Sequence, residues 1–296
     1  MITYRSRFLT RGEVWFDNEP EDTGAVDWII YHQRSRPVEG ARVRYFYTYA
    51  IDLTQSGEQL LANLNRDTAY KIRRARERDG ILCERYDPRA QGVMNAFEQM
   101  YNQFAALKGL TRLNRARMES MAAAGVLDLS AAKDPQGNVL VYHANYRDRH
   151  RATGIELPSL YRAQLESTAR NLVGRANRYL TWTDILRYRE EDLKCFDFGG
   201  WYHGTDPGML RINDFKRGFG GKVLREYQCE EMRTLKGWVV IQTAALLDWA
   251  RRVGGRQRLL QPRPEPEAAI HEPDAGTFSA PTAAENLSLP DSRPAK

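Results

Sequence analysis

Residues 195–222 read CFDFGGWYHGTDPGMLRINDFKRGFGGK and contain two short blocks rich in aromatic residues and glycine. The first block predicts a short apolar strand over 195–198 that ends at Gly199 and Gly200. The second block, residues 215–221, sets a lysine between aromatic residues and glycines, just before a strand predicted over 223–228. These two blocks are the most informative part of the chain.

Strands and helices alternate upstream of this stretch. Apolar side chains at every second position predict a strand over 43–51. A capping box of Ser56 and Gln59 predicts the start of a helix whose apolar spacing continues to residue 80. Apolar residues three and four positions apart predict a second helix over 93–107.

The middle of the chain predicts an antiparallel meander and a further helix. Strands are expected over 126–132, 139–146 and 151–157, with the turn residues 134–137 between the first two. A helix is expected over 174–190. This order of elements predicts an α+β fold in which helices pack on a mixed, largely antiparallel sheet.

Composition restricts the class of protein. The chain has 296 residues and a formal net charge of +6, which favours anionic partners such as phosphates or nucleic acid. Its three cysteines, Cys83, Cys195 and Cys229, show neither disulfide spacing nor a zinc motif, so we expect a cytoplasmic setting and no metal. No run approaches the roughly 20 apolar residues that a membrane span requires.

The C-terminal part of the chain differs in composition from the rest. Seven of the thirteen prolines lie in 254–296, which predicts a disordered tail rich in Pro and Ala. Residues 237–250 are apolar nearly all round, which predicts a buried helix or one that docks on a partner chain and so allows a homo-oligomer. We therefore expect an N-terminal segment, 1–41, packed on a core domain, 42–253, followed by the tail.

Four motifs together resemble the FemAB-type branch of the GNAT superfamily, the peptidoglycan bridge-forming aminoacyltransferases and their relatives with one GNAT-like domain. The motifs are YKIRRARERDGI (70–81), GRANRYLTWTDILRYREE (174–191), FDFGG (196–200) and FKRGFGG (215–221). The order and spacing of the last two are the specific part. The resemblance spans residues 42–228 and implies a GNAT-like mixed, largely antiparallel sheet with helices on both faces.

The resemblance also implies an activity. Such enzymes move an acyl or aminoacyl group from acyl-CoA or aminoacyl-tRNA onto an amine acceptor. Coenzyme A or tRNA would therefore carry a co-substrate, and no cofactor would stay tightly bound. Two features differ from the bridge-forming enzymes: the chain has room for one GNAT-like unit, and it lacks a long charged helical hairpin for tRNA.

One short motif bears on the choice of donor. Enzymes with this fold that bind coenzyme A carry a Gln/Arg-x-x-Gly-x-Gly/Ala loop at a helix start, where backbone N–H groups hold pyrophosphate. Asn171-x-x-Gly174-x-Ala176 has the spacing but not the first residue. Acyl-CoA is therefore retained as a donor beside aminoacyl-tRNA.

Lys216 is the first candidate for catalysis. The resemblance implies that the Phe-Lys pair places a cation at the reaction centre, so Lys216 would stabilise the oxyanion and Phe215 would wall the cavity. A surface lysine on a helix is the alternative. Gly218, Gly220 and Gly221 either present backbone N–H groups to an anion or make a tight turn into the next strand.

Two further residues are candidates for moving the proton of the amine. Asp197 would orient the amine or accept its proton; the alternative is a cap or the partner of an arginine. His203 would also accept a proton, and a simply exposed loop histidine is its alternative. Gly199, Gly200 and Trp201 are the expected substrate contacts at the open end of the strand.

A basic helical segment is the candidate site for phosphate. Lys71, Arg74 and Arg78 share one helix face, which suits either a phosphate-rich donor or a solvated surface. A second functional hypothesis follows from the same residues. The chain would then be a non-catalytic GNAT-like module that binds an anionic polymer here, or a partner protein through helix 237–250.

Overall fold

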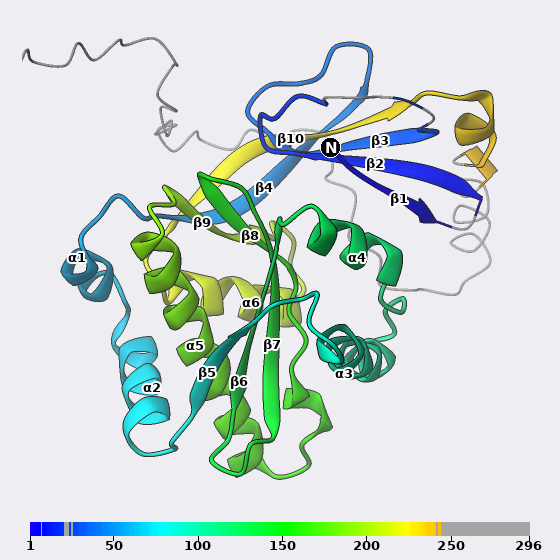
Figure 1. Cartoon of the computed structure of the whole chain (residues 1–296). Helices are drawn as coiled ribbons and strands as arrows, with labels where there is room; N and C mark the ends of the chain where they lie inside the picture. Colours follow the sequence, from blue (N-terminus) through cyan, green and yellow to red (C-terminus); the bar gives the residue numbers. More distant parts are fainter. Residues whose placement is uncertain (7, 21–23, 25, 241, 244–296) are drawn as a thin grey trace, which may run out of the picture. The chain divides into compact units, whose positions relative to one another are not determined.

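The computed structural model describes residues 1–6, 8–20, 24, 26–240 and 242–243 (Figure 1). Its strands are β1 (Ile2–Ser6), β2 (Leu9–Trp15), β3 (Trp28–Arg34), β4 (Arg42–Asp52), β5 (Leu82–Tyr86), β6 (Leu127–Lys133), β7 (Val139–Arg147), β8 (Arg151–Glu156), β9 (Cys195–Gly200) and β10 (Lys222–Met232). Its helices are α1 (Gly57–Ala62), α2 (Arg66–Glu77), α3 (Val93–Lys108), α4 (Arg115–Ala123), the 3-10 helix η1 (Leu160–Ala163), α5 (Ser167–Glu190) and α6 (Pro207–Arg217).

One ten-stranded sheet organises these elements, in the order β1-β2-β3-β10-β4-β9-β8-β7-β6-β5. Neighbouring strands are antiparallel except for the pairs β2–β3 and β8–β9, which are parallel. The predicted mixed, largely antiparallel sheet is confirmed. Residues 1–41, expected only to pack on the core, supply β1, β2 and β3 of this same sheet.

Helices cover both faces of the sheet, as predicted (Figure 1). Side chains of β6 and β7 alternate, so Leu129 and Ala144 pack with α3 and α4, whereas Ala132 and Val141 pack with α5. The same alternation directs the polar His143 toward α5. On the α5 side, α2 packs along α5.

Several helix boundaries differ from the prediction. The helix expected from Ser56 to residue 80 is two helices, because the side chain of Asn65 accepts the N–H of Thr68 at 2.8 Å and starts α2. The capping box of Ser56 is confirmed at the start of α1. Helix α5 begins at Ser167, earlier than the predicted residue 174. The sequence did not predict β5, α4 or α6.

The two C-terminal predictions fall largely outside the described residues. Of the segment 237–250, residues 237–240 and 242–243 are described and helical, and 254–296 are not described. Among the residues that are described, no helix has the length and apolar character needed to cross a membrane.

Candidate active site

Strands β8 and β9 run parallel and then separate. Their pairing ends at Thr153 and Asp197, although β8 continues to Glu156 and β9 to Gly200. A pocket of about 260 Å³ opens where the two strands part. A ligand in this pocket would therefore contact the backbone of both strand ends.

Strands and helices from distant parts of the sequence line this pocket. Strands β8 and β9 provide its base, and β2, β3 and α4 add aromatic and charged side chains. The lining residues are Trp15, His32, Gln33, Phe46, Arg117, Thr153, Gly154, Ile155, Glu156, Gly199, Gly200 and Gln228.

Glu156 offers the pocket a carboxylate that can exchange a proton with a ligand. Its side chain is 26 % exposed, lies 3.7 Å from Nη1 of Arg117, and accepts a hydrogen bond from Tyr101. Burial raises the pKa of Glu156, and the opposing effects of Arg117 and Tyr101 do not cancel that rise. A carboxylate with a raised pKa suits general base catalysis near neutral pH.

A buried carboxylate holds one wall of the pocket in place. Glu13 is 3 % exposed and binds Arg117 through hydrogen bonds of 2.6 and 3.1 Å. Trp15 Nε1 donates to the same carboxylate at 3.2 Å, and the Trp15 ring stacks on His32 with 4.2 Å between ring centroids. Trp15, His32 and Arg117 therefore present a fixed aromatic and cationic surface to the pocket.

Asp197 is fully buried on the pocket side of β9. Its donors are Gln33, Thr48, Arg151 and the backbone N–H of Gly199. Four donors fill the roughly four acceptor positions of a carboxylate. Asp197 is therefore the partner of an arginine in this structure, as the alternative interpretation held. Its hydrogen bonds connect β9 to β3, β4 and β8.

Lys216 reaches from α6 to the end of β9. Its Nζ donates to the carbonyl of Gly199 at 3.1 Å and to that of Gly200, and both glycines line the pocket. The residue is 6 % exposed, and no carboxylate among the described residues forms an ion pair with it. Burial lowers the pKa of Lys216 to about 8, against the opposing charge of Asp197. The two carbonyls use two of the three ammonium protons. Lys216 itself is not among the residues that line the pocket, so it adjoins the pocket through Gly199 and Gly200.

Gly199 is required by the shape of this strand end. Its φ is +71°, and a Cβ there would lie 3.2 Å from the carbonyl oxygen of Gly154. We expect Gly199→Ala to lower the free energy of unfolding by about 1–2 kcal/mol, measured by chemical denaturation. Gly57→Ala is the control, because a Cβ at Gly57 meets nothing within 4 Å. Equal stability of the two variants would contradict this role of Gly199.

The other aromatic and histidine candidates lie beside the strand end and do not line the pocket. Phe215 packs in the core on the α5 side of the sheet. Trp201 stacks on Tyr49 with 5.0 Å between ring centroids. His203 packs edge-on against Tyr47 at 4.3 Å, and burial lowers its pKa.

Gly218, Gly220 and Gly221 connect α6 to β10 in a tight turn. Their backbone N–H groups donate to two carbonyls of α6 and to the hydroxyl of Tyr49. A Cβ on Gly220 would overlap the backbone of Asn63. The tight-turn alternative, rather than an anion nest, therefore describes these glycines.

The basic face of α2 does not line the pocket, and part of its charge is neutralised. Lys71 pairs with Asp67 at 2.7 Å, and Arg74 lies 3.7 Å from Asp79. Arg78 is the C-cap of the helix. Phosphate binding by this face stays a prediction.

The segment that partly matched a pyrophosphate loop lies within a helix. Gly174 and Ala176 follow the start of α5 by more than one turn, and Ala176 is fully buried. Backbone N–H groups inside a helix are bonded to the preceding turn and cannot hold phosphate. The expectation of a helix start at this motif was therefore wrong.

Sequence reasoning missed the pocket residues from the N-terminal segment and from α4. Two stretches, 9–15 and 28–34, are rich in β-branched and aromatic residues and were the available signal for β2 and β3. Glu156 ends a strand that was predicted. Its raised pKa depends on burial and on contacts with Arg117 and Tyr101, which no local pattern reveals.

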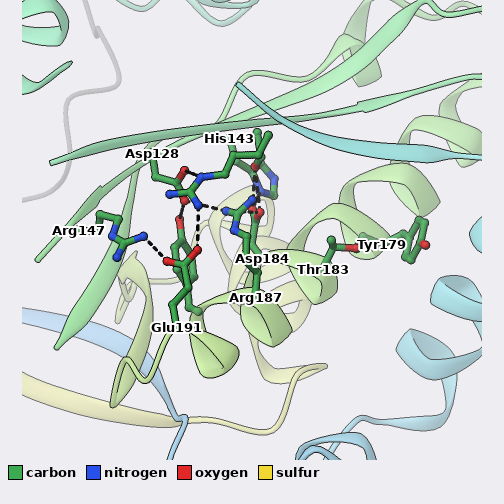
Figure 2. A network of polar contacts seen from close by, with 11 residues as sticks. Asp128, His143, Arg147, Tyr179, Thr183, Asp184, Arg187 and Glu191 are labelled. Atoms are coloured by element: carbon green, nitrogen blue, oxygen red, sulfur yellow. Dashed lines mark hydrogen bonds and ion pairs between the residues drawn. The ribbon is translucent and has the colours of Figure 1, made fainter. Parts of the chain in front are cut away.

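A second polar network lies between β6, β7 and α5 (Figure 2). Asp184 is fully buried and binds His143 Nδ1 at 2.8 Å, while Arg187 bridges Asp184 and Asp128. None of these residues lines the pocket, so the network anchors α5 to the sheet. In the described ranges, neither this network nor any other cluster groups three His, Cys, Asp or Glu side chains suited to a metal ion.

Two solved structures share this architecture. The crystal structure of FemX aligns with a TM-score of 0.54 at 12 % identity, covering 69 % of this chain and 72 % of that chain. The C-terminal domain of a protein assigned as a lysylphosphatidylglycerol synthetase from Agrobacterium fabrum aligns with a TM-score of 0.50 at 15 % identity, covering 79 % of this chain and 82 % of that chain. The chain shares its GNAT-like fold with these two structures.

The fold that was predicted from the FDFGG and FKRGFGG blocks is therefore confirmed. No family model matches the sequence, and no curated protein matches it either. Within the GNAT-like fold, the two blocks meet where the ammonium of Lys216 donates hydrogen bonds to the backbone carbonyls of Gly199 and Gly200.

Proposed function

We propose that the chain is an acyl- or aminoacyltransferase that moves an activated acyl group onto an amine in the pocket between β8 and β9. The observation that carries this proposal is Glu156, a partly exposed carboxylate with a raised pKa in the pocket lining. The ammonium of Lys216 beside the same pocket supports it. The GNAT-like fold is compatible with this chemistry but does not select it.

In the proposed reaction Glu156 is the general base. The amine nitrogen attacks the carbonyl carbon of the donor, and Glu156 accepts a proton as the C–N bond forms. The tetrahedral intermediate then breaks its bond to the thiolate sulfur of coenzyme A or the ribose oxygen of tRNA. Glu156 returns the proton to that leaving atom. The amine attacks directly, so no protein nucleophile is needed.

Lys216 is proposed to stabilise the negative charge on the tetrahedral intermediate. It is nearly buried, and a charge acts more strongly at low dielectric than in water. Its third ammonium proton would bond to the oxyanion. Asp197 acts as a positioning residue, because it holds Arg151 and the start of the turn at Gly199.

The donor is proposed to enter as a co-substrate, either acyl-CoA or aminoacyl-tRNA. Lys71, Arg74 and Arg78 would contact its phosphates. His203, which packs against Tyr47 and does not line the pocket, is the second candidate for accepting the proton of the amine. The ion pairs of Lys71 and Arg74 reduce the free charge of α2. This reduction applies equally to the phosphates of a donor and to an anionic polymer, so the charge of α2 does not choose between the transferase and the non-catalytic module.

The rate is expected to follow a bell-shaped pH profile. Glu156 acts when deprotonated and its pKa is raised, so the rate should rise with pH through a value above the ordinary range of a glutamate. Lys216 acts when protonated, so the rate should fall as pH rises through about 8. Lys216→Arg keeps a charge that does not titrate in this range and should remove the alkaline limb. An unchanged alkaline limb in that variant would contradict the role of Lys216.

Native mass spectrometry of the purified chain tests the proposed function even though the substrate is unidentified. A retained coenzyme A thioester, aminoacyl ester or acylated amine would support the transferase and would name the donor or acceptor. Retention of a nucleic acid or a protein partner, with no donor consumed in a broad panel of activated acyl compounds, would support the non-catalytic alternative instead.

A further inference from the structure

Exposed apolar side chains gather around the end of α3 and the segment between β8 and α5. Leu157 is 40 % exposed and Leu165 is 89 % exposed. The remaining exposed apolar residues of these two segments are Leu107, Leu110 and Tyr161. Helix α3 packs against η1, so the two segments are neighbours. We call residues 107–112 together with 157–165 the α3–η1 surface.

Cations lie among these apolar side chains. Lys108 is the last residue of α3, and Arg162 lies in η1, which packs against α3. In agreement with this packing, burial and the positive charge of Arg162 lower the pKa of Lys108. Neither one forms an ion pair within the described part of the chain. Arg112 adds a third positive charge, and two acidic residues, Glu156 and Glu166, directly flank residues 157–165. The ammonium of Lys108 lies 4.4 Å from the ring centroid of Phe104, and two neighbouring cations without a carboxylate beside them favour binding of an anion.

We propose that the α3–η1 surface docks on an anionic lipid membrane. Leu157 and Leu165 would enter the boundary between headgroups and acyl chains, and Lys108 and Arg162 would contact lipid phosphates. Exposed leucines beside cations match an anionic lipid membrane, which offers both an apolar interior and phosphate groups. A nucleic acid would use the cations and aromatic rings but would gain little from exposed leucines.

The position of this surface has a consequence for the pocket. Leu157 directly follows Glu156, which lines the pocket between β8 and β9. Membrane docking would therefore bring the pocket close to the headgroup layer. Docking does not rest on the proposed reaction, because it is measured with no donor or acceptor present.

Co-sedimentation of the full chain with vesicles tests the proposal. One set contains phosphatidylcholine and phosphatidylglycerol in equal parts, and the other contains phosphatidylcholine alone. The chain should bind the anionic vesicles at least about tenfold more tightly. The double variant Leu157→Ser, Leu165→Ser should weaken that binding about tenfold, because two inserted apolar side chains are lost. The double variant Lys108→Glu, Arg162→Glu should weaken it at least tenfold, to about the level of the neutral vesicles.

Two surface substitutions of matched chemistry serve as controls. Leu61→Ser changes an exposed leucine of α1, and Arg149→Glu changes an exposed arginine between β7 and β8. Both should bind like the unmodified chain, within about twofold. Failure to sediment with anionic vesicles would overturn the proposal. So would binding that depends on the cations alone and is displaced by inorganic phosphate or RNA, since the leucines would then have no part in it.

Discussion

Glu156→Gln should lower turnover about a thousandfold, because glutamine cannot accept the proton of the attacking amine. Glutamine keeps the size of the side chain and still accepts the hydrogen bond from Tyr101. Substrate affinity should therefore change little, so the loss would appear in kcat rather than in KM. Initial rates at varied donor and acceptor concentrations, measured by amide formation, separate these two parameters.

The acid limb of the pH profile is a second readout of the same substitution. It should disappear in Glu156→Gln, since the group that titrates there is gone. Glu58→Gln, which alters an exposed acid of α1, should leave both rate and profile unchanged. Turnover of Glu156→Gln within about tenfold of the unmodified chain would contradict general base catalysis by this residue.

Lys216→Met should lower turnover about a hundredfold or more without destabilising the fold. Burial lowers the pKa of Lys216 from 10.5 to about 8, so keeping the ammonium charged in the folded chain costs about 3 kcal/mol. The two hydrogen bonds to Gly199 and Gly200 return about 1 kcal/mol each. The net cost of keeping Lys216 charged is the larger, so the free energy of unfolding should be equal or higher in the variant at pH 7.

The pH dependence of stability gives an independent check on Lys216. Its pKa is lower in the folded state, so the unfolded chain binds more protons between about pH 8 and 10.5. The stability contributed by Lys216 therefore rises with pH across this window, and the rise should be absent in Lys216→Met. Lys194→Met changes an exposed lysine and should keep the rise. A marked loss of stability with little loss of turnover would make Lys216 a structural residue.

The part of the fold that the sequence predicted consists of elements with a regular apolar pattern or with recognisable turn residues at their ends. Strand β4, helix α3 and the meander β6 to β8 have this pattern, and their predicted positions are confirmed. The two glycine-rich blocks predicted the fold through resemblance. In the structure they belong to β9 and to the end of α6 with the turn after it, and they pack together through Phe198 and Phe219.

The walls of the pocket could not be predicted because they depend on contacts between distant segments. Strand β3 reaches the pocket only because β10 lies between β3 and β4 in the sheet. Arg117 is held by Glu13, more than a hundred residues earlier in the chain. Asp197 could be placed on a strand from its neighbours, but its burial beside Arg151 follows from the parallel pairing of β8 and β9.

Amide formation by the purified chain, followed by mass spectrometry, tests the central claim most directly. The unmodified chain would be incubated with charged tRNA or acyl-CoA and a panel of amines, beside Glu156→Gln as the matched variant. We expect an amine whose mass increases by the acyl group, formed by the unmodified chain and about a thousandfold more slowly by the variant. No acylated amine from either donor, or equal formation by the two proteins, would contradict it.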